Sequence, residues 1–195
     1  MRTIFFSLYL TKSKIRADLL TLFFLNPDRS YYLRELVRRF GYSVGSLARE
    51  LKAFSKEGLF ERAERGKEVF YRLHHRHPLF TEIRGIVEKT VGIPKRLSDG
   101  LQSLKEIQEA YLYGSFVKGK MKVDSDIDLI LVGDETQRLK SLLKQLEAKF
   151  DRSISSVLFS PEEFQSKKDV KGDFLYAVIR SPLIQIKPLK EKEWI

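Results

Sequence analysis

The 195-residue sequence contains no cysteine, so it can form neither disulfides nor thiolate metal sites, and it has no thiol nucleophile. It also lacks a long hydrophobic run, because a stretch such as Leu19–Leu25 falls far short of the roughly 20 residues of a membrane-spanning helix. The apolar residues 1–10 lead straight into basic residues and show no small-residue cleavage site, which argues against a secretory signal peptide. We therefore expect a cytoplasmic protein that is not embedded in a membrane.

Excess positive charge is confined to one half of the chain. Residues 1–97 contain 20 Lys and Arg against 10 Asp and Glu, whereas residues 98–195 contain 16 of each. The whole formal net charge of +10 therefore belongs to the first half. A basic unit joined to a neutral one indicates a polyanion-binding module that carries a second function, although a merely solvated basic surface is the alternative. The sequence thus predicts two domains, 1–97 and 98–195.

Apolar residues at helical spacing predict three helices in the first half. The first buries a face over 15–23 and stops before a turn-forming Asn-Pro-Asp-Arg cluster. The second covers 33–40 and is followed by Gly41, a residue that often ends helices in the left-handed conformation. The third begins after Ser43, a good N-cap residue, and runs to about Lys56.

A β-hairpin is predicted directly after the third helix. Residues 59–63 and 69–73 are rich in apolar and aromatic side chains and flank a compact turn over 64–68 with Gly66 at its tip. Two helices joined by a tight turn and followed by a basic hairpin resemble the winged helix-turn-helix of small prokaryotic repressors of the ArsR type, over about residues 13–75. The motif that carries this resemblance is Leu47-x-x-Glu50-Leu51-x-x-Phe54-x-x-x-Gly58-Leu59-Phe60.

This resemblance implies that the first half binds double-stranded DNA. The residues expected to contact DNA are polar or basic and lie on the third helix or in the hairpin: Ser43, Ser46, Arg49, Lys52, Arg65 and Lys67. A protein-interaction role is the alternative, because winged helices also serve that purpose. A further amphipathic helix over 79–91 stands where such repressors often pair subunits, so a homodimer is expected, and a linker is predicted over 92–96.

The motif most informative about chemistry lies in the second half. An apolar strand ends at Gly114 and Ser115, and a second strand is predicted to begin at Ser125. Asp126 and Asp128 stand two apart on that strand, so both carboxylates project from one face. Such a pair suits Mg²⁺, which binds a few carboxylates together with phosphate oxygens. Gly114 lets the backbone approach a triphosphate, and Ser115 can donate to a phosphate oxygen.

The combined motif is Gly114-Ser115-x3-Gly119-x5-Ser125-Asp126-x-Asp128-Leu129. It resembles the minimal nucleotidyltransferase domain of the DNA polymerase beta superfamily, over about residues 99–180. The resemblance implies a small α/β domain, and hence a two-domain α/β (α+β) protein. It also implies that Gly114 and Ser115 contact a nucleoside triphosphate and that Asp126 and Asp128 are the catalytic, Mg²⁺-binding residues. Lys118 is either a further phosphate contact or a solvated loop charge.

The sequence departs from that family at one place. Active members supply a third carboxylate from a later strand, and the position that aligns with it here is Ser155. Asp151, Glu162 or Glu163 could instead fold back to supply the missing ligand. The favoured hypothesis is a transcriptional regulator whose second domain binds a nucleotide and transfers it slowly or not at all. The alternative is an active Mg²⁺-dependent nucleotidyltransferase, antitoxin-like, that transfers AMP to a protein, nucleic acid or small acceptor.

Overall fold

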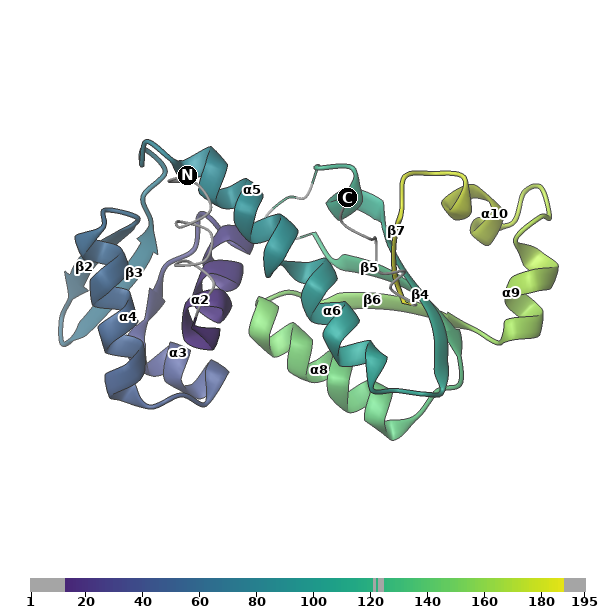
Figure 1. Ribbon diagram of the computed structural model, residues 1–195, viewed down its shortest axis with the longest axis horizontal. Helices are drawn as coiled ribbons and strands as arrows, with labels where there is room; N and C mark the ends of the chain where they lie inside the picture. The colour runs from purple at the N-terminus through teal and green to yellow at the C-terminus, as the bar shows by residue number, and fades with distance from the viewer. Residues whose placement is uncertain (1–12, 121, 123–124, 188–195) are drawn as a thin grey trace, which may run out of the picture. The chain divides into compact units, whose positions relative to one another are not determined.

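The computed structural model describes residues 13–120, 122 and 125–187 (Figure 1). The chain divides into two compact units, Met1–Ile93 with Lys149–Asp151, and Pro94–Ala148 with Arg152–Ile195. The expectation of no signal peptide concerns residues that lie outside the described part. Among the described residues, no helix is long and apolar enough to cross a membrane.

The first unit combines helices with a small antiparallel sheet. In chain order its described elements are α2 (Lys14–Leu25), β1 (Tyr31–Tyr32), α3 (Leu33–Phe40), α4 (Val44–Lys56), β2 (Phe60–Arg65), β3 (Glu68–Leu73) and α5 (Phe80–Thr90). The helices and the hairpin agree with the sequence prediction. The two-residue strand β1 was not predicted, and it extends the hairpin to a sheet in the order β1-β3-β2.

Local sequence explains where these helices begin and end. The side chains of Ser13 and Ser43 accept hydrogen bonds from the amides of Arg16 and Ser46, which caps α2 and α4. Gly41 takes the left-handed conformation, with φ of 71°, and ends α3 as predicted.

Aromatic and aliphatic side chains from all of these elements form the core of the first unit. Phe23 of α2 stacks on Phe60 of β2 with ring centroids 4.3 Å apart. On α5, Ile83 and Val87 are buried in the same core, and Phe80 packs against it. The apolar face that was expected to pair subunits is therefore occupied within its own unit.

The hairpin turn is shorter than predicted. Strand β2 continues to Arg65, which pairs with Glu68, so the turn consists of Gly66 and Lys67 alone. Gly66 has φ of 61°, as the first position of a type II′ hairpin turn requires. Arg65 is therefore a strand residue and not part of the tip.

The second unit begins with a helix that was not predicted. Helix α6 (Ile93–Gln102) begins inside the stretch where we expected a linker, so residues 93–96 are helical. The helix break itself lies where it was expected, because α5 ends at Thr90 and the two units divide between Ile93 and Pro94. Pro94 suits the first turn of a helix because the N–H that proline lacks would have no intrahelical partner there. Gly92 precedes the helix, and a Cβ at this position would lie 2.8 Å from the carbonyl oxygen of Glu88.

A four-stranded sheet forms the centre of the second unit, in the order β6-β5-β4-β7. Its strands and the remaining helices are β4 (Ile107–Tyr113), α7 (Gly114–Val117), β5 (Ile127–Gly133), α8 (Gln137–Phe150), β6 (Ile154–Phe159), α9 (Pro161–Lys167), α10 (Phe174–Ile179) and β7 (Ile184–Lys187). Strand β4 is antiparallel to β5 and β7, whereas β5 and β6 are parallel. This mixed α/β arrangement agrees with the predicted fold of the second domain.

Apolar packing on the sheet decides which way the site residues point. Phe164 of α9 and Leu175 of α10 pack with Ile130 and Val132 of β5. Because side chains alternate along a strand, the Asp128 side chain lies on the same face of the sheet as Ile130 and Val132, near the start of β5. The carboxylate therefore lies at the margin of a packed apolar face.

Candidate active site

Gly114 stands at the junction of β4 and α7, directly beside the carboxylate of Asp128. Tyr113, the last residue of β4, pairs with Asp128 across the antiparallel ladder. Gly114 follows in the left-handed conformation with φ of 74°. A Cβ built on it would lie only 2.0 Å from Oδ2 of Asp128, so any other residue here would force the Asp128 carboxylate to move. The sharp turn brings the start of α7 against the carboxylate.

The electrostatics of Asp128 reflect two neighbours and its burial. Burial raises the pKa of Asp128 above its ordinary value, the negative charge of Asp126 raises it further, and a hydrogen bond from the Ser115 amide opposes both effects. Burial, followed by the charge of Asp128, raises the pKa of the Tyr113 hydroxyl. The two carboxylates therefore repel one another, and a cation placed between them would relieve that repulsion.

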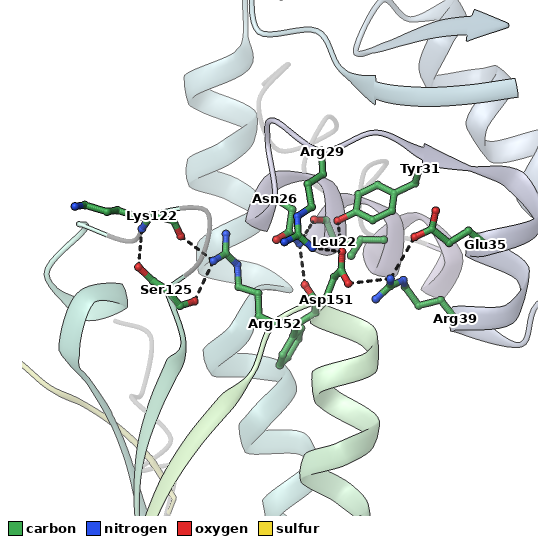
Figure 2. A network of polar contacts seen from close by, with 11 residues as sticks. Leu22, Asn26, Arg29, Tyr31, Glu35, Arg39, Lys122, Ser125, Asp151 and Arg152 are labelled. Atoms are coloured by element: carbon green, nitrogen blue, oxygen red, sulfur yellow. Dashed lines mark hydrogen bonds and ion pairs between the residues drawn. The ribbon is translucent and has the colours of Figure 1, made fainter. Parts of the chain in front are cut away.

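Asp126 lies just before β5 and not on it, because the strand starts at Ile127. Its side chain is exposed. The backbone on both sides of it is hydrogen-bonded to Arg152 and Ser153, which precede β6. Arg152 donates to the carbonyl oxygens of Lys122 and Ser125 at 2.8 and 3.0 Å (Figure 2). Sequence reasoning missed Arg152, because no local pattern connects it to residues 27 and 30 positions earlier.

The other predicted nucleotide contacts surround the start of α7. Ser115 is half-buried in this four-residue helix, and its carbonyl oxygen accepts a hydrogen bond from the Lys120 amide at 2.9 Å. Lys118 is the C-cap residue of α7, and its side chain is exposed, as is that of Lys120. The structure thus brings Gly114, Ser115 and Asp128 into direct proximity and leaves Lys118 one helical turn away.

Ser155 occupies the position beside Asp128 on the neighbouring strand. The two residues are direct partners in the parallel ladder between β5 and β6, so their side chains project from the same face. The Ser155 hydroxyl group therefore lies on the sheet face that carries the Asp128 carboxylate. Within the described part of the chain, no group of three or more His, Cys, Asp or Glu side chains is arranged to hold a metal ion.

The acidic residues considered as substitutes have other partners or positions. In the first unit, the Asp151 carboxylate accepts hydrogen bonds from Arg29 at 2.8 Å, Arg39 at 2.9 Å and the Tyr31 hydroxyl at 2.9 Å (Figure 2). Glu163 forms a capping box with Ser160 at the start of α9. Glu162 is exposed in the first turn of the same helix.

Some of the side chains predicted to contact DNA are exposed, whereas others already have partners within the first unit. Ser43 caps α4 and donates from its hydroxyl to Oγ of Ser46 at 2.9 Å, so both hydroxyls have local partners. Arg49 and Lys52 are exposed on α4, and Lys67 is exposed in the hairpin turn. The Arg65 guanidinium lies over the Phe70 ring, 5.2 Å from its centroid.

Comparison with known proteins assigns the second unit to a family. Residues 95–184 match the family model described as polymerase beta, nucleotidyltransferase. This part of the chain is a polymerase beta-type nucleotidyltransferase domain. No such match supports a winged helix-turn-helix in the first unit, for which the structure establishes only helices and a small antiparallel sheet. A comparison with curated proteins gave no match.

Two solved structures are similar to parts of the chain that contains this nucleotidyltransferase domain. One, a toxin–antitoxin with AMP-PNP, has 23% identity and a TM-score of 0.30, and covers 33% of this chain and 56% of its own. The other, a mutant of the toxin–antitoxin MntA-HpeT, has 15% identity and a TM-score of 0.34, and covers 48% of this chain and 72% of its own. The chain thus spans little more than half the length of the first of these.

The donor set of the nucleotidyltransferase domain fits Mg²⁺. Asp126 and Asp128 provide carboxylate oxygens, the ligand type that this cation prefers, and each charge disfavours the other in the absence of a cation. The absence of a side chain at position 114 lets the Asp128 carboxylate lie directly against the turn. These residues would hold a Mg²⁺ ion together with the phosphates of a nucleotide.

Proposed function

We propose that this chain is a Mg²⁺-dependent nucleotidyltransferase that uses a nucleoside triphosphate and transfers its nucleotidyl group to an acceptor oxygen. The single observation that carries the proposal is the contact between the Gly114 turn and the Asp128 carboxylate, within residues that match the nucleotidyltransferase family. In the transfer, the acceptor oxygen forms a bond to the α-phosphorus, and pyrophosphate leaves.

Each residue of the site has a distinct part in this proposal. Gly114 lets the triphosphate approach the backbone at the start of α7, where the Ser115 hydroxyl can donate to a phosphate oxygen. Asp126 and Asp128 hold Mg²⁺, which when bound neutralises phosphate charge and orients the triphosphate. Lys118 adds a positive charge near the phosphates.

Ser155 limits the rate in this proposal. A neutral hydroxyl beside Asp128 neither binds a cation as strongly as a carboxylate nor accepts the proton of an incoming hydroxyl group. We expect transfer to be slower than in a three-carboxylate site by on the order of 10²–10⁴-fold, the usual contribution of general acid–base catalysis. Binding of the triphosphate, which needs only the residues that are present, should remain.

The test measures binding and transfer separately. The 195-residue chain is titrated with ATP, CTP, GTP and UTP in Mg²⁺ and in EDTA, and is then incubated with α-labelled nucleotides and candidate acceptors. The change of Asp126 and Asp128 to Asn should abolish Mg²⁺-dependent affinity, whereas Asp134→Asn, at the far end of β5 and exposed, should not. Equal affinity in Mg²⁺ and EDTA for the unchanged protein would refute the proposal.

A second function is favoured by the exposed basic residues of the first unit. We propose that this unit binds double-stranded DNA as a winged helix-turn-helix, with α4 as the helix that enters the major groove and the β2–β3 hairpin as the wing. Support comes from the exposed side chains of Arg49, Lys52 and Lys67 and from the excess positive charge of residues 1–97. Such binding would place the nucleotidyltransferase at a DNA site or would make the protein a transcriptional regulator.

The test of this second function is the salt dependence of duplex binding. Each phosphate that the protein neutralises releases counterions, so the affinity should fall steeply between 50 and 200 mM salt, by a factor on the order of 10³ or more for six contacts. Light scattering of the same samples tests whether the protein is a homodimer. Absence of duplex binding at low salt would refute the proposal.

A further inference from the structure

Arg152 is a buried arginine that has no role in the nucleotide binding proposed above. It precedes β6 and is 8% exposed. Burying a guanidinium group costs several kcal/mol unless its N–H groups find good acceptors. Nη1 of Arg152 donates to two carbonyl oxygens, those of Lys122 and Ser125 (Figure 2). The arginine therefore fixes the backbone at two positions just before Asp126.

Two further hydrogen bonds join Lys122 and Ser125 directly. The Lys122 amide donates to Oγ of Ser125 at 2.8 Å, and the Ser125 amide donates to the Lys122 carbonyl oxygen at 3.1 Å. On the other side of Asp126, the Ile127 amide donates to the carbonyl oxygen of Ser153 at 2.9 Å. Arg152 and Ser153 are consecutive, so one short segment holds the backbone on both sides of Asp126.

Asp126 needs such support more than Asp128 does. Asp128 lies inside the ladder, paired with Tyr113 on one side and Ser155 on the other. Asp126 comes before the first strand residue, and its side chain is exposed, so its place depends on bonds made by its neighbours. Loss of the Arg152 bonds would free the residue that precedes Asp126.

We propose that Arg152 is a positioning residue of the nucleotide site, which keeps the Asp126 carboxylate beside that of Asp128 so that both face one cation. The proposal rests on the function proposed above, which assigns the two carboxylates to Mg²⁺. Residues that orient a metal-binding side chain without touching the metal typically change affinity by about 10- to 100-fold. We expect a loss of Mg²⁺-dependent ATP affinity in this range for Arg152→Met.

Lys187 offers a matched control in the same sheet. Its Nζ also donates to two carbonyl oxygens, those of Leu101 at 2.7 Å and Leu104 at 2.6 Å. It pairs with Ala110, three residues along β4 from Tyr113 and therefore about 10 Å from the site end of that strand. Lys187→Met removes the same kind of bond and should lower the stability without lowering ATP affinity by more than about twofold.

The experiment compares Arg152→Met, Arg152→Lys and Lys187→Met in the full chain. Calorimetry measures ATP affinity in Mg²⁺ and in EDTA, and thermal unfolding measures stability. Arg152→Lys keeps a charged donor and should bind more tightly than Arg152→Met. Equal ATP affinities in Arg152→Met and Lys187→Met, at similar stability, would overturn the proposal.

Amide hydrogen exchange provides a readout that needs no nucleotide. Exchange at Ser125 and Ile127 should accelerate by about tenfold or more in Arg152→Met and stay unchanged in Lys187→Met. Unchanged exchange in Arg152→Met would show that the arginine does not hold this backbone, and would overturn the inference by itself. If wild-type protein binds no ATP in Mg²⁺ while the exchange behaves as expected, the proposed function fails, and with it the role of Arg152 in the nucleotide site.

Discussion

Replacement of Gly114 by alanine tests the geometry of the site most directly. The added Cβ would lie 2.0 Å from Oδ2 of Asp128 and 2.9 Å from its Cγ, whereas ordinary contact begins near 3.4 Å. Asp128 would have to move by roughly 1.4 Å, and a displacement of about 1 Å in a catalytic site can cost 10²-fold in rate. We expect Gly114→Ala to lower Mg²⁺-dependent ATP affinity by about 10- to 100-fold.

Replacement of a second glycine, Gly119, distinguishes the effect of this clash from the effect of backbone strain. Gly119 also has positive φ, 65° against 74° for Gly114, but no described atom lies within 4 Å of its would-be Cβ. Both alanine variants should therefore lose about 1–2 kcal/mol from the left-handed conformation, measured by urea unfolding. Only Gly114→Ala should lose ATP affinity in calorimetry. If the two variants bind ATP equally well, the close approach of the backbone to Asp128 has no functional meaning.

Three further predictions concern other parts of the chain. Ser155→Asp adds a carboxylate beside Asp128, so nucleotidyl transfer from labelled ATP should increase by at least tenfold, and an unchanged or lower rate would contradict the assigned role of Ser155. Double replacement of Arg65 and Lys67 by alanine should weaken binding to all duplexes alike, whereas Arg49→Ala should change the preference among sequences in a selection assay. The ion pairs of Asp151 with Arg29 and Arg39 outweigh its burial and lower its pKa, so this group stabilises the first unit above the ordinary aspartate pKa and loses that contribution as the pH falls below it. Asp151→Asn should then cost about 1–2 kcal/mol at pH 7 in urea unfolding, and this cost should shrink steadily as the pH falls from the ordinary aspartate pKa through the lowered one. A cost that does not change with pH would contradict this prediction.

Features with short-range causes could be predicted from the sequence. The α3 end at Gly41 and the α4 cap at Ser43 depend on residues within one helical turn, so both predictions are confirmed. The break after α5 lies within the predicted linker, but residues 93–96 are helical, because proline is favourable at the start of a helix and Pro94 lies in the first turn of α6. The hairpin turn is shorter than the predicted 64–68, because the charged residues Arg65 and Glu68 pair across the ladder.

The candidate site shows the same division between local and distant causes. The proximity of Gly114 to Asp128 agrees with the compact motif that contains both, and Ser155 pairs with Asp128 on the next strand, at the position where the family resemblance implies a third carboxylate. Arg152 could not be recognised, because its acceptors are backbone carbonyls, which every residue carries, and they lie 27 and 30 positions earlier in the chain. A sequence pattern contains only side-chain types. The hydrogen bonds that hold the backbone beside Asp126 are accepted by main-chain carbonyl groups, which the parallel pairing of β5 and β6 brings together. The residues that hold a site in place are therefore harder to predict than those that act in it, and in this protein the first must come from the structure.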